Sequence, residues 1–224
     1  MRIIKENLLY HIFDYQVILV GMGPNNSFVN GFCENVAVNF PNVKQYEMEH
    51  SRYGDRSKYG TILPIEENGI IFCMCYMHDG GYAKKYNGPV YMNYEHLESC
   101  LKKVSEKYGN LKIASPIIGD TKYDGDGDKE KIISLFEKYF NDKDLDLYDY
   151  EPMRVLAELY FQRKKLVDDL RNYRITREEY EKERSRVMWQ IRNGIFKPMP
   201  EDYVYHQRKR EKYLMVKKSD IPKK

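Results

Sequence analysis

Apolar residues along the first two thirds of the chain gather in short runs separated by polar turns. The run at 70–77, IIFCMCYM, is apolar throughout, and the run at 112–116 is nearly so. Strands that are buried on both faces lose the polar alternation of half-exposed strands. The pattern therefore predicts an α/β protein, a three-layer α/β/α fold over residues 1–150. We predict its strands near 17–20, 61–64, 70–77, 112–116 and 145–150.

The last third of the chain follows a helical period instead. Apolar side chains recur at positions 155, 156, 159, 160, 166, 167 and 170, which is the spacing of one helical face. Thr176 and Glu179 have the spacing of a capping box that opens a second helix, and Gly194 is placed to end that helix. These segments predict a helical hairpin whose apolar face packs on itself or on the α/β fold.

Formal charge divides the chain at Pro152. Residues 1–150 hold 17 Lys and Arg against 22 Asp and Glu, whereas residues 151–224 hold 20 against 12. We therefore predict two domains, 1–150 and a basic helical extension at 151–224. The final segment, 202–224, interleaves Tyr with Arg and Lys, which suits nucleic acid but is also typical of a solvated helix and a frayed terminus. Nucleic acid or a second copy of the chain is the candidate partner of 151–224.

Composition excludes several classes of protein. No run reaches the roughly 18 apolar residues of a membrane span, and the N-terminal MRIIKENLLYHIFDYQ lacks the pattern of a signal peptide. We expect a cytoplasmic protein without membrane contact. Cys73 and Cys75 lie in a buried run, and the chain has no second close pair of cysteines. The sequence therefore predicts no metal site, and we expect no resident cofactor.

Two loops that lead from a strand into a helix carry the candidate chemistry. Residues 111–140 run from an apolar strand through a loop with three glycines into an amphipathic helix, and residues 16–41 repeat that order. Such a loop aims backbone N–H groups and the positive end of a helix dipole at one point, which suits a phosphate or diphosphate. Two such loops at one sheet edge frame a single cleft. The pattern indicates a nucleotide-like ligand, with ordinary turns as the alternative.

Short motifs recur in a fixed order through residues 1–150. They are ENLL (6–9), VGMG (20–23), FVNGFC (28–33), NFP (39–41), YGDRSKYGT (53–61), NYEHL (93–97) and SPIIGDTKYDGDGD (115–128). This ordered series resembles the macro domain, a family that binds ADP-ribose. Each motif alone is loose, so the specificity comes from their order and spacing. The branch that the chain resembles most includes ADP-ribose 1''-phosphate phosphatases and ADP-ribosyl glycohydrolases.

The resemblance implies a site for ADP-ribose built from the N-terminal segment and the two loops. It places Asn7 near the adenine, although a loop Asn that bonds its own backbone is the alternative. Around the diphosphate it implies the following residues: Gly21, Gly23, Asn30, Gly31, Phe32 and Cys33 from the first loop, and Gly119, Asp120, Thr121, Lys122 and Tyr123 from the second.

Departures from the family pattern bear on catalysis. The family's first loop carries a His and an Asn that fall at Val20 and Gly23 here, and in several members that Asn is needed for hydrolysis. The replacement favours binding without chemistry. A hydrolase would activate water with Asp126, which aligns with the Asp of the family's G-G-D-W, or with His78. For His78, the alternative interpretation is a plain turn at 78–79. A scaffold with a vestigial cleft is the third hypothesis.

Overall fold

The computed structural model describes residues 1–25, 28, 31–79, 91–120, 125–149, 155–200 and 203. The chain falls into two compact units, Met1–Pro152 and Met153–Lys224. Each unit is considered by itself below.

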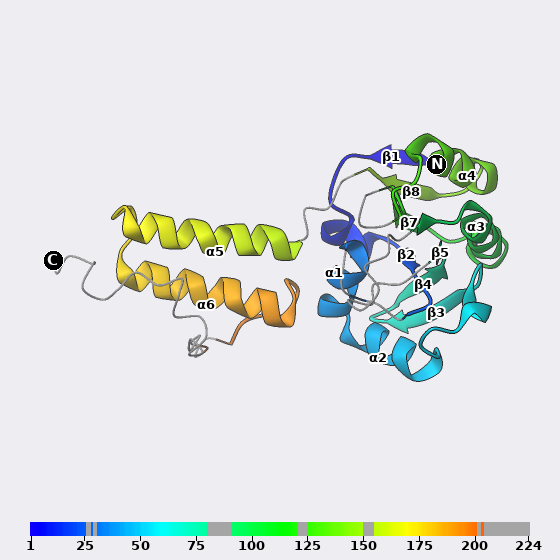
Figure 1. Cartoon of the computed structure of the whole chain (residues 1–224). Helices are drawn as coiled ribbons and strands as arrows, with labels where there is room; N and C mark the ends of the chain where they lie inside the picture. Colours follow the sequence, from blue (N-terminus) through cyan, green and yellow to red (C-terminus); the bar gives the residue numbers. More distant parts are fainter. Residues whose placement is uncertain are drawn as a thin grey trace. The chain divides into compact units, whose positions relative to one another are not determined.

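A six-stranded sheet in the order β1-β8-β7-β2-β4-β3 forms the centre of the first unit (Figure 1). Its strands are β1 (Arg2–Ile4), β2 (Val17–Met22), β3 (Ile62–Glu67), β4 (Ile70–Tyr76), β7 (Ile113–Pro116) and β8 (Leu145–Tyr148). All neighbouring pairs are parallel except β3 with β4. The carboxyl ends of β2, β4, β7 and β8 therefore share one edge, where ligands of open α/β sheets bind.

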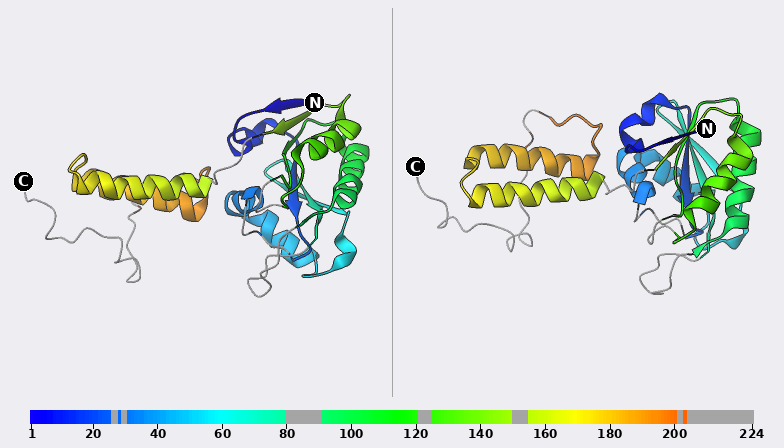
Figure 2. Two further views of the ribbon diagram at one scale, coloured as in Figure 1. Left: turned by 45° about the horizontal axis from the view of Figure 1, so that its top comes forward. Right: turned by 90° about the horizontal axis from the view of Figure 1, so that it is seen from above.

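Helices cover both faces of this sheet, as the view from above shows (Figure 2). On one side lie α3 (Tyr94–Tyr108) and α4 (Lys129–Phe140); on the other lie the 3-10 helix η1 (Leu8–Asp14), α1 (Gly31–Asn39) and α2 (Pro41–His50). A second 3-10 helix, η2 (Arg56–Lys58), precedes β3. The predicted three-layer α/β/α fold is confirmed.

The packing of β4 on both faces explains why its sequence is apolar throughout. Cys73 and Cys75 belong to the core cluster that includes Leu97 and Phe136 of α3 and α4. Phe72 points to the other face, where its ring lies 4.6 Å from that of Phe40. A strand packed on both sides has no position for a polar side chain facing water.

The structure corrects several local expectations. The five predicted strands are present with shifted ends, but β1 was not predicted. The segment His78–Asp79 is a short strand, β5, that pairs with β6 (Tyr91–Met92), so the expected turn is wrong. The segment predicted as strand, loop and helix over 16–41 is followed directly by a further helix, α2, which was not predicted and begins at Pro41, a position that tolerates a missing N–H.

A buried carboxylate, Asp146 of β8, holds β1 at the edge of the sheet. Arg2 donates to its two oxygens over 2.7 and 2.6 Å, and the Tyr15 hydroxyl donates to it over 2.8 Å. Burial alone would raise the pKa of Asp146, but the hydrogen bonds from Arg2 and Tyr15 outweigh burial and hold that pKa below its usual value. These bonds from one buried carboxylate add to the backbone pairing of the three-residue strand β1 with β8.

We expect Asp146→Asn to lower the free energy of unfolding by about 2 kcal/mol at neutral pH, since hydrogen bonds to a charged group are lost. A carboxyl with a lowered folded-state pKa stabilises the fold above its unfolded pKa of about 4 and loses that contribution as the pH falls. Urea unfolding of both proteins between pH 7 and pH 2 measures this. The gap between them should close in acid, and a gap independent of pH would contradict the assignment.

The second unit contains the predicted hairpin, formed by α5 (Val155–Arg171) and α6 (Arg177–Asn193). The capping box of Thr176 and Glu179 is present, and Gly194 caps α6 with a φ of +83°. The two helices pack against each other and bury Leu159, Leu170, Tyr180, Val187 and Met188. None of the helices that the structure describes is long and apolar enough to cross a membrane.

Candidate functional site

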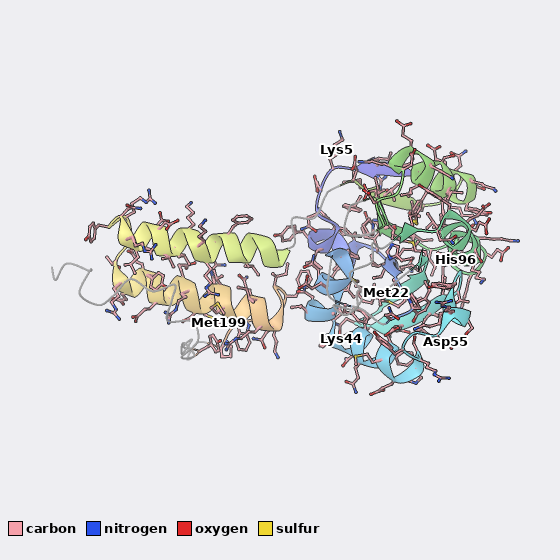
Figure 3. The ribbon with its side chains drawn as sticks, viewed as in Figure 1. Lys5, Met22, Lys44, Asp55, His96 and Met199 are labelled. Atoms are coloured by element: carbon pink, nitrogen blue, oxygen red, sulfur yellow. The ribbon has the colours of Figure 1, made fainter. Side chains whose placement is uncertain are left out.

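Three loops meet at the carboxyl edge of the sheet, after β2, β4 and β7. Met22, labelled in Figure 3, ends β2, and its carbonyl accepts a hydrogen bond from the Met77 amide over 3.0 Å. Farther along, the Met92 amide donates to the Gly125 carbonyl over 3.0 Å. Because Met92 pairs with His78 across β5 and β6, backbone contacts connect the loops after β4 and β7 directly.

Two glycines join the two ends of the loop after β7 through a backbone hydrogen bond. The Gly127 amide donates to the Gly119 carbonyl over 2.8 Å. Gly125 has a φ of +117°, and a Cβ at this residue would lie 3.1 Å from the Met92 amide nitrogen and 3.2 Å from the Gly119 oxygen. Only glycine allows this approach. Sequence reasoning selected Gly119 but missed the roles of Gly125 and Gly127, because these depend on the partner Met92.

Asp126 lies between those two glycines. Its side chain is exposed and its φ is +51°, in the left-handed region that Asp enters more easily than most residues. Non-glycine residues held in this region cluster at functional sites. The candidate catalytic carboxylate therefore stands at the surface of the closed loop.

Gly21 lies where β2, β5 and the end of β7 come together. A Cβ on Gly21 would stand 2.1 Å from Ile118 Cγ2 and 2.9 Å from Met77 Cε. The same position is 3.6 Å from His78 Cε1, and His78 is 5% exposed. The structure thus brings Gly21, His78 and the segment before Gly119 together, with His78 buried among them.

Helix α1 begins at Gly31, the glycine of the first loop. Gly31 has a φ of +58°, and among the residues that the structure describes no atom lies within 4 Å of where its Cβ would be. The next residue, Phe32, is buried, and Cys33 is half-buried. Gly31 therefore combines a helix N-terminus with open space, which is what close approach of a ligand requires.

The N-terminus of α4 differs from the sequence prediction, in which this end of the helix faces a phosphate. Asp128 is its N-cap: the carboxylate accepts a hydrogen bond from the Lys131 amide over 3.0 Å. The Asp128 amide in turn donates to the Tyr94 hydroxyl over 2.8 Å. A carboxylate at this end already compensates the helix dipole, so α1 offers the more open of these two N-termini to an anion.

Asn7 is the N-cap of η1. Its Oδ1 accepts a hydrogen bond from the Leu9 amide over 3.0 Å, as the backbone alternative for this residue predicts. The side chain is 7% exposed, and Nδ2 is buried with no hydrogen-bond partner among the described residues. Asn7 therefore has an unused donor, Nδ2, whereas its acceptor, Oδ1, already takes part in a hydrogen bond.

Other expected site residues are less defined. Gly23 is half-buried, as is Asp120. Asn30, Thr121, Lys122 and Tyr123 lie outside the described residues. Within the described part of the chain, no group of three or more His, Cys, Asp or Glu side chains is arranged to hold a metal ion.

Comparisons with known proteins agree with this architecture. The sequence matches no protein-family model and no curated protein sequence. Among solved structures, the macrodomain of Thermus aquaticus DarG superposes with a TM-score of 0.52 at 15% identity, covering 67% of this chain and 97% of that one. The macrodomain of Mycobacterium tuberculosis DarG gives a TM-score of 0.52 at 14% identity, over 65% and 96% of the two chains.

A Bacteroides thetaiotaomicron protein, structural genomics target BtR9, gives a TM-score of 0.53 at 15% identity, over 66% of this chain and 98% of that one. Each of these comparison chains is matched almost completely, whereas about a third of the present chain lies outside the match. At such identities the similarity concerns the fold. The chain therefore contains a unit with the macrodomain fold.

Proposed function

We propose that this chain binds ADP-ribose or an ADP-ribose derivative at the carboxyl edge of its sheet. One observation carries the proposal: Gly31, on the loop after β2, begins α1 at a position that no atom of the described residues fills. In a macrodomain fold this loop is positioned at the edge where ligands of α/β sheets bind. The closed loop after β7 supplies a second wall at the same edge.

The diphosphate would bind to backbone amides. We assign it to the segment Gly31 to Cys33 on one side and to the segment Gly119 to Tyr123 on the other, with Gly21 and Gly23 below and Asn30 beside it. Backbone N–H groups at a helix start are suited to phosphate oxygens.

Asn7 would recognise the adenine through its unused donor. Because Oδ1 already accepts from Leu9, the side chain would donate from Nδ2 to a ring nitrogen of the base rather than accept from the exocyclic amine. Nδ2 is buried, so this contact requires the neighbouring residues to move when the ligand binds.

Isothermal titration calorimetry of the full chain with ADP-ribose tests the proposal. We expect one site with a Kd of about 10 μM or below, near −7 kcal/mol. AMP, which lacks one phosphate and the second ribose, should bind at least about tenfold more weakly. Absence of heat at millimolar ADP-ribose would contradict the proposed function.

Hydrolysis is the second candidate, and the left-handed conformation of the exposed Asp126 favours it. Buried His78 has little access to water, and Gly23 carries no side chain to orient a ribose, so we expect binding without turnover. Phosphate release from ADP-ribose 1''-phosphate and release of ADP-ribose from a modified protein measure this. Turnover that Asp126→Asn lowers by about a hundredfold or more would instead make Asp126 the general base.

We propose that residues 151–224 serve contacts with a second macromolecule, either nucleic acid or another copy of the chain, and not the nucleotide site. Removing them should change ADP-ribose affinity by less than about threefold, or about 0.7 kcal/mol. Oligomer size and retention on nucleic acid should change instead. An insoluble truncated chain, or one that loses the ligand, would show that the helical extension belongs to the ligand-binding unit.

A further inference from the structure

Four polar side chains are buried together outside the proposed ADP-ribose contacts. They are Glu47 of α2, Ser51 at the C-terminal end of α2, Lys58 of η2 and Tyr76 at the end of β4, and we refer to them as the anchor cluster. Glu47 is 0% exposed and Lys58 is 9% exposed. Charged residues are rarely buried to this extent unless they are paired.

The members of the anchor cluster are mutually hydrogen-bonded. Lys58 Nζ donates to Ser51 Oγ over 2.7 Å and lies 4.0 Å from Glu47 Oε1. The Tyr76 hydroxyl donates to Glu47 Oε1 over 2.9 Å and lies 3.1 Å from Ser51 Oγ. The ammonium group also stands 4.8 Å from the centre of the Tyr76 ring. The cluster thus joins α2, η2 and β4 at one point.

Stability does not account for this arrangement. Burial raises the pKa of Glu47 and lowers the pKa of Lys58, so the protein interior opposes the charged form of each. Apolar side chains of similar volume are often as stabilising as a buried ion pair, or more so. Charged and hydrogen-bonded groups make the packing more specific, because their hydrogen bonds require defined positions of donor and acceptor.

The segment 51–61 is held at both ends. The anchor cluster holds its first residue, Ser51, and also Lys58, and at the other end the Gly60 amide donates to the main-chain carbonyl of Tyr76 over 2.8 Å. Asp55, labelled in Figure 3, marks its middle. There the Gly54 amide donates to the Pro24 carbonyl over 2.9 Å. Pro24 belongs to the loop that leads from β2 to Gly31, so the segment 51–61 braces the first loop of the proposed site.

We propose that the anchor cluster is a positioning device for the ADP-ribose loop, acting through the hydrogen bond between Gly54 and Pro24. Its residues touch no ligand. They hold the segment 51–61 in one place, and that segment holds residues 24 and 25 against it. The inference rests on the proposed function, because the loop it positions is the one assigned to the diphosphate.

The test uses the full-length double variant Glu47→Met, Lys58→Met, which removes both charges and keeps side-chain volume. Amide hydrogen exchange of Gly54 is measured by NMR without ligand, together with the melting temperature and the Kd for ADP-ribose. We expect Gly54 exchange to accelerate by about tenfold or more and the Kd to rise by about tenfold, while the melting temperature stays level or rises. Arg56→Met, which removes an exposed cation from the same segment, should leave both readouts unchanged.

Each outcome decides a separate point. Unchanged Gly54 exchange in the folded double variant overturns the proposal, as does faster exchange with an unchanged Kd. If the unaltered chain binds no ADP-ribose, the proposed function fails, and the exchange rates alone then decide whether the anchor cluster holds the loop. Should the double variant not fold, Tyr76→Phe, which removes one hydroxyl from the cluster, is expected to give a smaller acceleration in the same direction.

Discussion

Replacement of Gly31 by Glu is expected to weaken ADP-ribose binding by at least about a hundredfold, or about 2.7 kcal/mol. The new side chain would occupy the unfilled space beside Gly31 and set a carboxylate against the diphosphate. Because Gly31 has a φ of +58°, the variant also carries backbone strain of about 1 kcal/mol. Calorimetric titration gives the affinity, and thermal unfolding gives the stability.

Gly69→Glu is the matched control. Gly69 has a φ of +76°, and its Cβ position is also free of neighbours. It lies in the turn between β3 and β4, at the sheet edge opposite to the carboxyl ends of β2 and β4. The control therefore adds the same charge and similar strain far from the proposed site. Equal affinity in a folded Gly31→Glu variant, or equal loss in both variants, would remove Gly31 from the site.

Gly21→Ala is expected to lower the free energy of unfolding by about 3 kcal/mol, the upper range for overpacking. The added Cβ would stand 2.1 Å from Ile118 Cγ2, so the buried Ile118 side chain, β2 or the segment after β7 must shift. Chemical denaturation measures the loss.

The double variant Gly21→Ala, Ile118→Ala provides the internal control. Removing the Ile118 side chain leaves room for the new methyl group, so part of the lost stability should return as a favourable coupling energy of about 1 kcal/mol or more. Full stability of the single variant, or purely additive effects, would contradict the tight packing at this strand junction.

The pattern of apolar residues predicted those parts of the fold that are fixed by local sequence. Strand β4 was recognisable because both of its faces are buried, and α6 because Thr176 and Glu179 form its capping box. Strand β1 was not, because three residues carry no periodicity. Their position comes from pairing with β8 and from the contact of Arg2 with Asp146, both far along the chain. Helix α2 was not predicted, because a proline such as Pro41 is equally compatible with the end of one helix and the start of the next.

The residues of the candidate site were predictable from the sequence, but the role of each residue was not. Gly31 and Gly21 were both selected as loop glycines, yet one faces open space and the other is packed against Ile118. Only tertiary contacts distinguish these situations. In Asn7 the structure shows which amide atom is already used. Asp128, by contrast, carried a readable signal, since an Asp directly before an amphipathic helix is a common N-cap.

Hydrogen–deuterium exchange of the full chain with and without saturating ADP-ribose is the sharpest test of binding at the carboxyl edge of the sheet. We expect slower exchange in the loop after β2 and in the loop after β7, where backbone amides would bind the diphosphate. Exchange in the turn at Asn68 and Gly69 and in α6 should not change. No protection at any segment, or protection confined to the helices of residues 155–193, would show that the ligand does not bind at the carboxyl edge of the sheet.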